Sequence, residues 1–434
     1  MRKVLLATTA LVGVALFGAT SPAQAAPAPS PITVNMGGYV DFVAGFYRES
    51  PGTEPGEKRS SRDFLTEFKI NVEAMGKAAN GIEYGANISL WNGPEVSDFV
   101  PAFDNIGSPE QTPWSGGRNN VTVNSAYVWT SGAFGKALFG DEHGASDLFV
   151  YAPTVGEGQI DGRYMDFVDP MTLARFQPSG IDNTEHSTKI TYYTPKVGND
   201  NHKVQAGVSY APNHYDYGSS IIKFSETGNG SANSRVYSPY QDVIEGDIAY
   251  WGNFNPVSVV LSAQITTGDS SPDGATGSLP VLFQNAPTVI GPDPSNPAFQ
   301  DFTAWGLGGQ VTYAGVTVGG SYNDMGRYGT VHDQNRQQEV WTAGAKYEMD
   351  KVSVAANWLN GEGYSNLLRS GSGTTASTVN GTNYVMFNAY GAGATYTWFP
   401  GLTSAVDGVF FNQSANRNDH NEGYVIMLSQ KMTF

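Results

Sequence analysis

The chain has 434 residues, a formal net charge of −16, no cysteine and 52 glycines. The lack of cysteine excludes disulfide frameworks and thiolate metal sites, and the acidic charge argues against nucleic acid as a partner. After residue 25, no apolar stretch is long enough for a transmembrane helix, so a chain of this kind spans a membrane only as a closed barrel.

The N-terminal residues have the pattern of a secretory signal peptide. Two basic residues precede an apolar run over 4–17, and the small-residue cleavage pattern Ala23-Gln24-Ala25 follows. The run is too short to span a bilayer as a helix, although an uncleaved anchor is the alternative. We predict a signal peptide over residues 1–25 and a single β-barrel domain over residues 26–434.

Beyond the signal peptide, apolar and polar residues alternate with period two. In one example, Phe64, Phe68 and Ile70 share one face, whereas Glu67 and Lys69 share the other. Such alternation indicates strands with one apolar and one polar face. The predicted strands cover 33–47, 62–77, 82–92, 121–131, 136–145, 188–197, 202–213, 242–252, 257–269, 302–313, 316–326, 339–348, 352–362, 382–398, 402–413 and 422–434.

The connections between these strands alternate between tight turns and long polar loops. The tight turns contain Gly, Asn, Asp or Pro, which supply the backbone angles that hairpins need. They are Ala78–Gly81, Gly132–Gly135, Gly198–Asn201, Asn253–Pro256, Ala314-Gly315, Met349–Lys351 and Phe399–Gly401. Short turns on one side and long loops on the other are typical of outer-membrane barrels.

A soluble sandwich has the same alternation, so other features decide between the two architectures. The predicted strands are about 10–16 residues long, whereas strands of globular proteins are typically about 5–6 residues. The polar faces carry carboxylates that a packed interior does not bury unpaired. Aromatic residues also gather at strand ends, as in the girdles of membrane barrels. These residues are Phe46, Tyr47, Trp91, Trp129, Trp251, Trp358, Trp398 and Phe399.

Three segments resemble the Gram-negative general porins, which are sixteen-stranded trimeric outer-membrane channels. The first is the opening strand Val34–Phe42, the second is the hairpin formed by Ala126–Trp129 and Gly135–Asp141, and the third is the terminal strand ending in Phe434. The resemblance implies an all-β fold: a transmembrane antiparallel 16-stranded β-barrel with a long third loop folded into the lumen. It also implies a water-filled channel for small hydrophilic solutes and ions in the cell outer membrane of a Gram-negative bacterium.

The third loop of such porins narrows the channel. Here the corresponding loop covers about Ser146–Ser187 and is rich in carboxylates. The constriction residues implied by the resemblance are Asp147, Glu157, Asp161, Arg163, Asp166, Asp169 and Arg175. By strand parity, the predicted pore wall consists of Asp41, Asp63, Glu67, Lys69, Glu73, Glu83, Asp141, Glu245 and Asp247.

The wall departs from the family pattern after the fifth strand. Where the family often has an arginine, Asp141-Glu142-His143 follows Gly140, and Lys69 is the clearest wall cation. Because fixed carboxylates attract cations, we predict a cation-preferring channel with an acidic third loop as its constriction.

Other chemistry finds little support in the sequence. The six histidines form no metal-binding motif and no pair at metal-ligand spacing, and no nucleophile elbow is present, so we predict neither a metal site nor an enzyme. Residues 268–274 offer oxygen ligands for a loop calcium, but their spacing is not that of an EF-hand, and a solvated loop is favoured.

Two alternatives stay open at this point. One is a substrate-selective porin for a sugar or a carboxylate. Tyr151, Tyr164, Phe167 and Phe176 in the third loop could stack on a sugar, although we favour packing of these rings against the wall. A secreted soluble β-rich binding protein is the other alternative.

The resemblance also implies partners: outer-membrane lipid, two further copies in a homotrimer, the outer-membrane assembly machinery and small hydrophilic solutes. The second loop, about Asn92–Asn120, is expected to contact a neighbouring subunit. The last strand, Tyr424–Phe434, is expected to close the barrel against Thr33–Tyr47, because an open edge does not persist in lipid. Phe434 resembles the signal by which the assembly machinery recognises its clients.

Overall fold

The computed structural model describes most of the chain after the predicted signal peptide. The described residues are 30–50, 61–92, 121–168, 176, 184, 186–214, 240–270, 300–328, 338–365, 383–415 and 419–434. The predicted signal peptide and the predicted subunit-contact loop between residues 93 and 120 lie outside them. Among the described residues, no helix has both the length and the apolar character needed to cross a bilayer.

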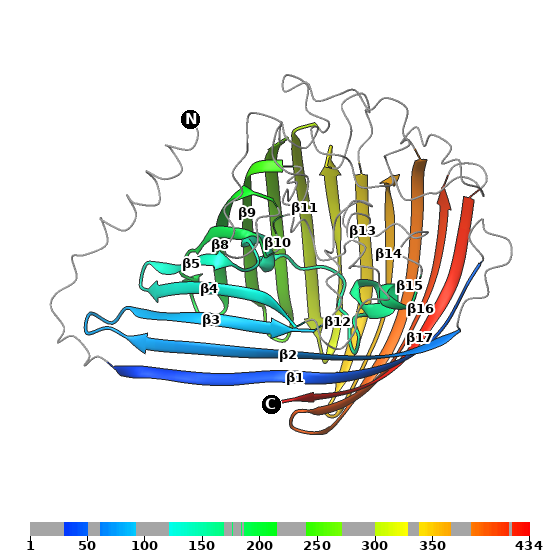
Figure 1. Cartoon of the computed structure of the whole chain (residues 1–434), viewed down its shortest axis with the longest axis horizontal. Helices are drawn as coiled ribbons and strands as arrows, with labels where there is room; N and C mark the ends of the chain where they lie inside the picture. The colour runs from blue at the N-terminus through cyan, green and yellow to red at the C-terminus, as the bar shows by residue number, and fades with distance from the viewer. Residues whose placement is uncertain are drawn as a thin grey trace, which may run out of the picture.

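The strands form one antiparallel sheet that curves around an interior (Figure 1). They are β1 (Ser30–Glu49), β2 (Arg62–Lys77), β3 (Glu83–Trp91), β4 (Thr122–Gly132), β5 (Gly135–Asp141), β6 (Thr188–Tyr193), β7 (Val197–Gly198), β8 (His202–Asn213), β9 (Tyr240–Asn253), β10 (Ser258–Ser270), β11 (Phe302–Tyr313), β12 (Val316–Gly326), β13 (Gln338–Met349), β14 (Val352–Ser365), β15 (Asn383–Phe399), β16 (Leu402–Ala415) and β17 (Asp419–Thr433). Because β6 and β7 both pair with β8, they form one interrupted span, and the sheet has the sixteen predicted spans.

The first and last strands close the sheet into a barrel. β1 pairs with β2 on one side and with β17 on the other, from Tyr39 opposite Thr433 to Glu49 opposite Gly423. Beyond this ladder, the Phe434 amide donates to the Gly38 carbonyl at 3.0 Å, and the Gly38 amide donates back at 2.9 Å. The predicted seam is therefore confirmed, and Figure 1 shows the red last strand meeting the blue first strand.

The tight turns lie where the sequence predicts them, but two predicted strands end differently. The strand predicted over 136–145 stops at Asp141, where Gly140 has φ +135° and a short helical turn begins at Ala145. The strand predicted over 188–197 breaks after Tyr193, because Pro195 has no amide proton for the ladder.

The two faces of the barrel differ as the alternation predicts. The outer face exposes large apolar side chains such as Leu261, Leu307 and Val318, which are 49%, 53% and 56% exposed. The inner face carries buried polar side chains, among them Asp41, Gln264 and Asp407. An apolar exterior around a polar interior is the arrangement of a barrel that faces lipid and encloses water.

The predicted aromatic girdle is only half right. Four of its residues face outward: Phe46, Trp358, Trp398 and Phe399. The other four face the interior: Tyr47, Trp91, Trp129 and Trp251. The reason is the period of a strand, since a shift by one residue moves a side chain to the opposite face. Further outward rings come from Trp305 and Trp341, which are 39% and 45% exposed.

Candidate functional site

Residues 142–168, which follow β5, lie inside the barrel; we call them the inner segment. They contain three short 3-10 helices: η1 (Ala145–Leu148), η2 (Gln159–Asp161) and η3 (Arg163–Phe167). The inner segment contacts inward-facing side chains of strands far along the sheet from β5, so it crosses the interior rather than standing above it (Figure 1).

The first half of the inner segment is held through its backbone by one strand after another. The Ala145 amide donates to Ser209 Oγ of β8 at 3.2 Å, and the Val150 amide donates to Ser262 Oγ of β10 at 2.9 Å. Gln310 of β11 then donates to the Tyr151 carbonyl at 2.7 Å. The Ala152 amide donates to Thr342 Oγ1 of β13 at 3.2 Å. These polar wall side chains satisfy a backbone that has no ladder of its own.

Gln159 and Asp407 form the centre of the second half. Asp407 of β16 is fully buried and accepts hydrogen bonds from the Glu157 amide, at 2.9 Å, and from the Gln159 side chain. The Gln159 side-chain oxygen accepts from the Val155 amide at 3.0 Å and from Asn357 of β14 at 3.1 Å. This network fixes η2 against β14 and β16.

Arg163 connects the end of the inner segment to β2, which lies on the other side of the seam from β16. Its guanidinium lies 2.6 Å from Glu67 of β2 and 3.1 Å from Glu157 within the inner segment. Burial opposes the charged form, but the hydrogen bond and charge of Glu67, with the charges of Glu157 and Asp166, raise the pKa of Arg163 above its ordinary value. Arg163 therefore remains a cation and holds η3 near β2.

Aromatic rings anchor the same half of the loop by apolar packing. Phe167 lies 6.0 Å from Tyr47 of β1, Tyr164 lies 6.4 Å from Phe411 of β16, and Phe176 stacks on Phe387 of β15 at 5.9 Å, each measured between ring centroids. All three loop rings are buried. Their faces are thus occupied by the wall, as favoured above, and are not presented to a sugar.

Two wall glycines make room for the inner segment. A Cβ atom at Gly308 of β11 would lie 1.7 Å from the Val150 carbonyl oxygen, and one at Gly45 of β1 would lie 2.3 Å from the Phe167 ring. Any larger side chain at these inward positions would displace the inner segment.

The predicted constriction residues have different environments. Asp147 and Asp166 are exposed. Glu157 pairs with Arg163, and Asp161 accepts a hydrogen bond from the Tyr151 hydroxyl. Burial, followed by the charge and hydrogen bond of Asp161, raises the pKa of Tyr151. Asp169 and Arg175 lie outside the described residues.

The predicted wall residues all belong to strands, but they divide into three groups. Asp41, Glu67, Glu245 and Asp247 are buried; Lys69, Glu73 and Asp141 are partly buried; and Asp63 and Glu83 are exposed near strand ends. Several of these acids have specific partners. Asp41 lies 3.6 Å from Lys431, and Glu83 pairs with Lys77 at 3.0 Å. Glu245 accepts from Ser209 Oγ at 2.5 Å and from Thr184, and Asp141 accepts from Thr188 Oγ1 at 2.6 Å. Buried acids such as Glu67 and Glu245 therefore hold the loop rather than face open water.

Three acidic groups lie near the Tyr127 side chain of β4. The charges of Glu142, Glu73 and Asp147 all interact with the Tyr127 hydroxyl, and the charge of Lys69 interacts with Glu142 and Glu67. Carboxylates from β2, from the end of β5 and from η1 thus face the same part of the interior.

Sequence reasoning missed the polar wall side chains that hold the inner segment. These are Ser209, Ser262, Gln310, Thr342, Asn357 and Asp407. Each lies at an inward-facing position, which the alternation identifies. Inward polarity alone, however, does not distinguish a side chain that meets water from one that meets a folded-in backbone.

The fold also brings together three potential metal ligands that the sequence keeps apart. No two histidines lie at metal-ligand spacing along the chain, but His143 and His186 become neighbours in the structure, next to Glu142. Residues 268–274, which offered oxygen ligands for a loop calcium but were favoured as a solvated loop, are described only over Gly268–Ser270, where they belong to β10.

Comparisons with known proteins agree with this architecture. The sequence profile of the Gram-negative porin family matches residues 7–416, whereas no curated protein matches the chain. The fold resembles the outer-membrane channel DcaP of Acinetobacter baumannii, with a TM-score of 0.53 at 14% identity over 93% of this chain and 97% of that one. It also resembles the anion-selective porin from Comamonas acidovorans (TM-score 0.51, 11% identity, 93% and 100% covered) and the trimer form of OmpT of Vibrio cholerae (TM-score 0.50, 11% identity, 93% and 100% covered). Since the family profile spans nearly the whole chain and the barrel closes as such a channel requires, the chain belongs to the Gram-negative porin family.

Proposed function

We propose that this outer-membrane channel passes small hydrophilic solutes and ions by passive diffusion, with the inner segment as its constriction, and that it is not an enzyme. The observation that carries the proposal is the anchoring of residues 142–168 to wall side chains from β8 to β16 and to Glu67 of β2. A segment held at so many points occupies part of the channel cross-section permanently. Its position therefore limits the size of the solutes that pass.

We further propose that the channel prefers cations. Asp147 and Asp166 are exposed on the inner segment, whereas the basic Arg163 and Lys431 lie beside carboxylates. Lys69 interacts with Glu142 and Glu67. Fixed negative charge in a narrow lumen raises the local concentration of cations. The anion selectivity named for the Comamonas porin belongs to that protein, since a fold shared at 11% identity does not carry over the charges of the lumen.

Reversal potentials test the ion preference. The purified protein, inserted into planar bilayers between unequal KCl concentrations, is expected to give a potential of the sign set by potassium permeation. A potential with the sign of chloride permeation at neutral pH would contradict the proposal. Unequal KCl is suitable because the two ions have similar mobility in water, so the sign reports the protein.

Different observations argue against the two alternatives, a soluble binding protein and a substrate-selective channel. Membership in the porin family excludes a secreted soluble binding protein. A sugar-selective channel is disfavoured because Tyr164, Phe167 and Phe176 are buried against the wall. A carboxylate-selective channel is disfavoured by the acidic groups in front of Tyr127. Saturable block of single-channel current by a sugar or a dicarboxylate would reverse this conclusion.

We also propose that three copies assemble, as the family and the trimer form of the Vibrio OmpT suggest. On the outer face, Gln430 accepts from Ser404 Oγ at 2.7 Å and donates to the Thr403 carbonyl at 2.9 Å, and Trp398 donates to Ser404 at 2.8 Å. This polar patch lies beside the outward-facing apolar residues Val406, Leu428 and Met432. Light scattering of the detergent-solubilised protein tests the assembly: a monomeric mass would contradict it.

A further inference from the structure

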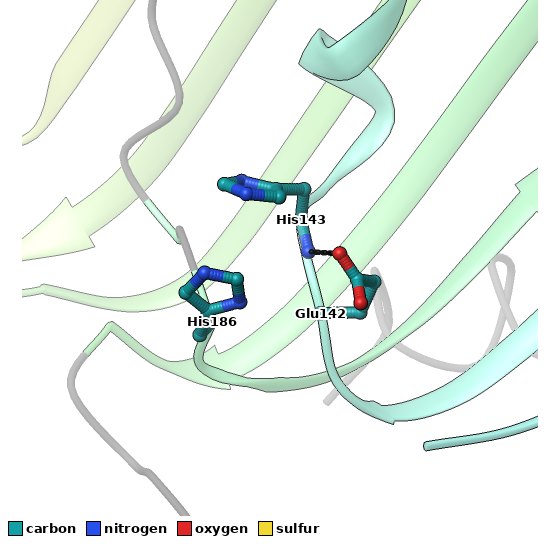
Figure 2. Close-up of side chains that lie close together, drawn as sticks. All are labelled: Glu142, His143 and His186. Atoms are coloured by element: carbon teal, nitrogen blue, oxygen red, sulfur yellow. Dashed lines mark hydrogen bonds between the residues drawn. The ribbon is translucent and has the colours of Figure 1, made fainter. Parts of the chain in front are cut away.

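Glu142, His143 and His186 converge inside the barrel at the base of the inner segment. One ligand atom from each lies within 4.8 Å of the others, and the two imidazole rings are 4.3 Å apart between centroids. Figure 2 shows the two rings next to one another, with the Glu142 carboxylate beside the His143 backbone. All three side chains are partly buried.

The topology of the sheet explains this convergence. β5 and β6 are neighbouring strands, and Asp141 lies opposite Thr188 at the end of their ladder. The chain that leaves β5 must therefore return to the same place before β6 begins. Thr188 Oγ1 donates to Asp141 at 2.6 Å, and Ser187 donates to the His214 carbonyl, so the returning residues are fixed on both sides of the junction.

We propose that Glu142, His143 and His186 bind a divalent transition-metal cation, for which Zn²⁺ is the probe. Two imidazoles and one carboxylate are a ligand set that suits zinc, nickel and copper, whereas calcium and magnesium prefer oxygen ligands alone. Water completes a four-coordinate site. The inference concerns metal binding and does not rest on the ion preference proposed above.

Neighbouring contacts orient two of the ligands. The side-chain nitrogen of Asn124 of β4 lies 3.0 Å from Nε2 of His186, and a 180° flip of this amide places its oxygen there instead, as metal binding at Nδ1 requires. With a metal at Nδ1, Nε2 carries the proton and donates it to the Asn124 oxygen, and this hydrogen bond fixes the tautomer and the ring. The Glu142 carboxylate accepts from the His143 amide through Oε1 at 3.1 Å, which fixes its orientation and leaves Oε2 for the cation.

The required adjustment is small. Donor atoms around a tetrahedral zinc ion lie about 3.4 Å apart, given metal–ligand distances of about 2.1 Å. Ligand atoms that lie within 4.8 Å of one another reach this spacing by side-chain rotation, without movement of the paired strands.

The surrounding charges set the strength of the site. Lys189 of β6 donates to the Glu142 carbonyl at 2.5 Å, and the charge of Lys69 interacts with the Glu142 carboxylate, which weakens cation binding. Glu142 also acts on Tyr127 together with Glu73 and Asp147, and these two acids favour a cation. We therefore expect a reversible site rather than a permanently occupied structural zinc.

Equilibrium binding of Zn²⁺ to the untagged full chain, folded in detergent, tests the proposal. Competition with a chromophoric chelator is expected to show one zinc per chain, and His143→Gln and His186→Gln are each expected to weaken binding at least about 10-fold. His420→Gln is the matched control, because His420 lies 3.3 Å from a carboxylate, Glu422, but has no second imidazole beside it among the described residues. That variant should bind as the wild type does.

Two further measurements keep the result decisive. Heat-modifiable migration verifies that each variant is folded. If a histidine variant does not fold, Glu142→Gln is measured in its place. Calcium in large excess should leave the zinc affinity unchanged, because the imidazoles carry the selectivity. The proposal is overturned if the wild type binds no stoichiometric zinc, if the site variants bind like His420→Gln, or if calcium displaces the zinc.

Discussion

Gln159 in η2 and Asp407 in β16 are joined by a hydrogen bond inside the barrel although they lie 248 residues apart along the chain. Asp407 also accepts from the Glu157 amide at 2.9 Å, so one wall carboxylate holds two points of the inner segment. The position of the inner segment therefore depends in part on Asp407.

Replacement of Asp407 should release η2 from the wall. Asp407→Ala removes the acceptor for the Glu157 amide and the Gln159 side chain, and we expect a loss of about 1–3 kcal/mol in stability together with noisier, larger single-channel currents. Thermal unfolding and bilayer recordings measure the two effects. Asp63→Ala is the control, since Asp63 is exposed and accepts from the adjacent Phe64 amide. Wild-type currents from Asp407→Ala would argue against anchoring by this residue.

The ion pair between Arg163 and Glu67 allows a double-mutant cycle. Arg163→Met leaves Glu67, whose side chain is 1% exposed, without its nearest cation, and should destabilise the barrel by about 3–5 kcal/mol. Adding Glu67→Gln should recover much of that loss, because the buried charge is then gone. Chemical denaturation followed by heat-modifiable migration gives the energies. Additive losses from the two single substitutions would show that the pair is not coupled.

The same pair makes a prediction for alkaline solution. The partners of Arg163 raise its pKa, so the guanidinium stays charged in the folded state. The stability that this charge contributes is fully present at any pH below the unfolded-state pKa, and it is lost only as the pH rises through the folded-state pKa. Single-channel conductance should therefore show no step attributable to Arg163 between pH 7 and pH 11. A step in the wild type that disappears in Arg163→Met would contradict this.

Side chains added to the wall should move the inner segment. Gly308→Ala places a Cβ atom 1.7 Å from the Val150 carbonyl oxygen, so we expect altered conductance and reduced stability. Gly246→Ala is a matched control in a strand, because its Cβ would meet Ile265 at an ordinary distance of 3.5 Å. If both variants conduct alike, the close approach at Gly308 does not position the inner segment.

Exposed carboxylates on the inner segment should carry part of the ion preference. Asp147→Asn and Asp166→Asn are each expected to lower the potassium-to-chloride permeability ratio about fourfold. One unit charge acting over roughly 10 Å of water favours potassium by about 0.4 kcal/mol and disfavours chloride by the same amount. Asp350→Asn, in the turn between β13 and β14, should leave the ratio unchanged. Equal ratios in all three variants would assign the preference to other charges.

The end of the last strand should matter more for assembly than for permeation. Deleting Phe434 removes its two backbone hydrogen bonds with Gly38 and an outward-facing ring that is 56% exposed. We expect a lower yield of folded protein in the outer membrane, with unchanged conductance of the molecules that do insert. A normal yield after this deletion would contradict a role of Phe434 in recognition by the assembly machinery.

The barrel itself could be predicted because its determinants are local. Alternation with period two fixed which residues of β2 and β17 face outward, and turn residues fixed where the hairpins lie. The seam between β1 and β17 followed from the requirement that no strand edge remains open in lipid. The errors came where a local pattern was insufficient, as with Trp129, whose place near a strand end did not reveal that it faces inward.

The candidate site could be predicted only in outline. The sequence by itself determined the spans and most of their faces, because these depend on residue spacing and on the solvent at each face. The loop that enters the barrel was implied only by the resemblance to porins. Only the tertiary structure decided that Asp407 holds Gln159, that Glu67 pairs with Arg163 and that His143 meets His186. Those contacts join residues that are distant along the chain. They depend on which strand ends the closed sheet places side by side, and on the path that the inner segment takes along the wall.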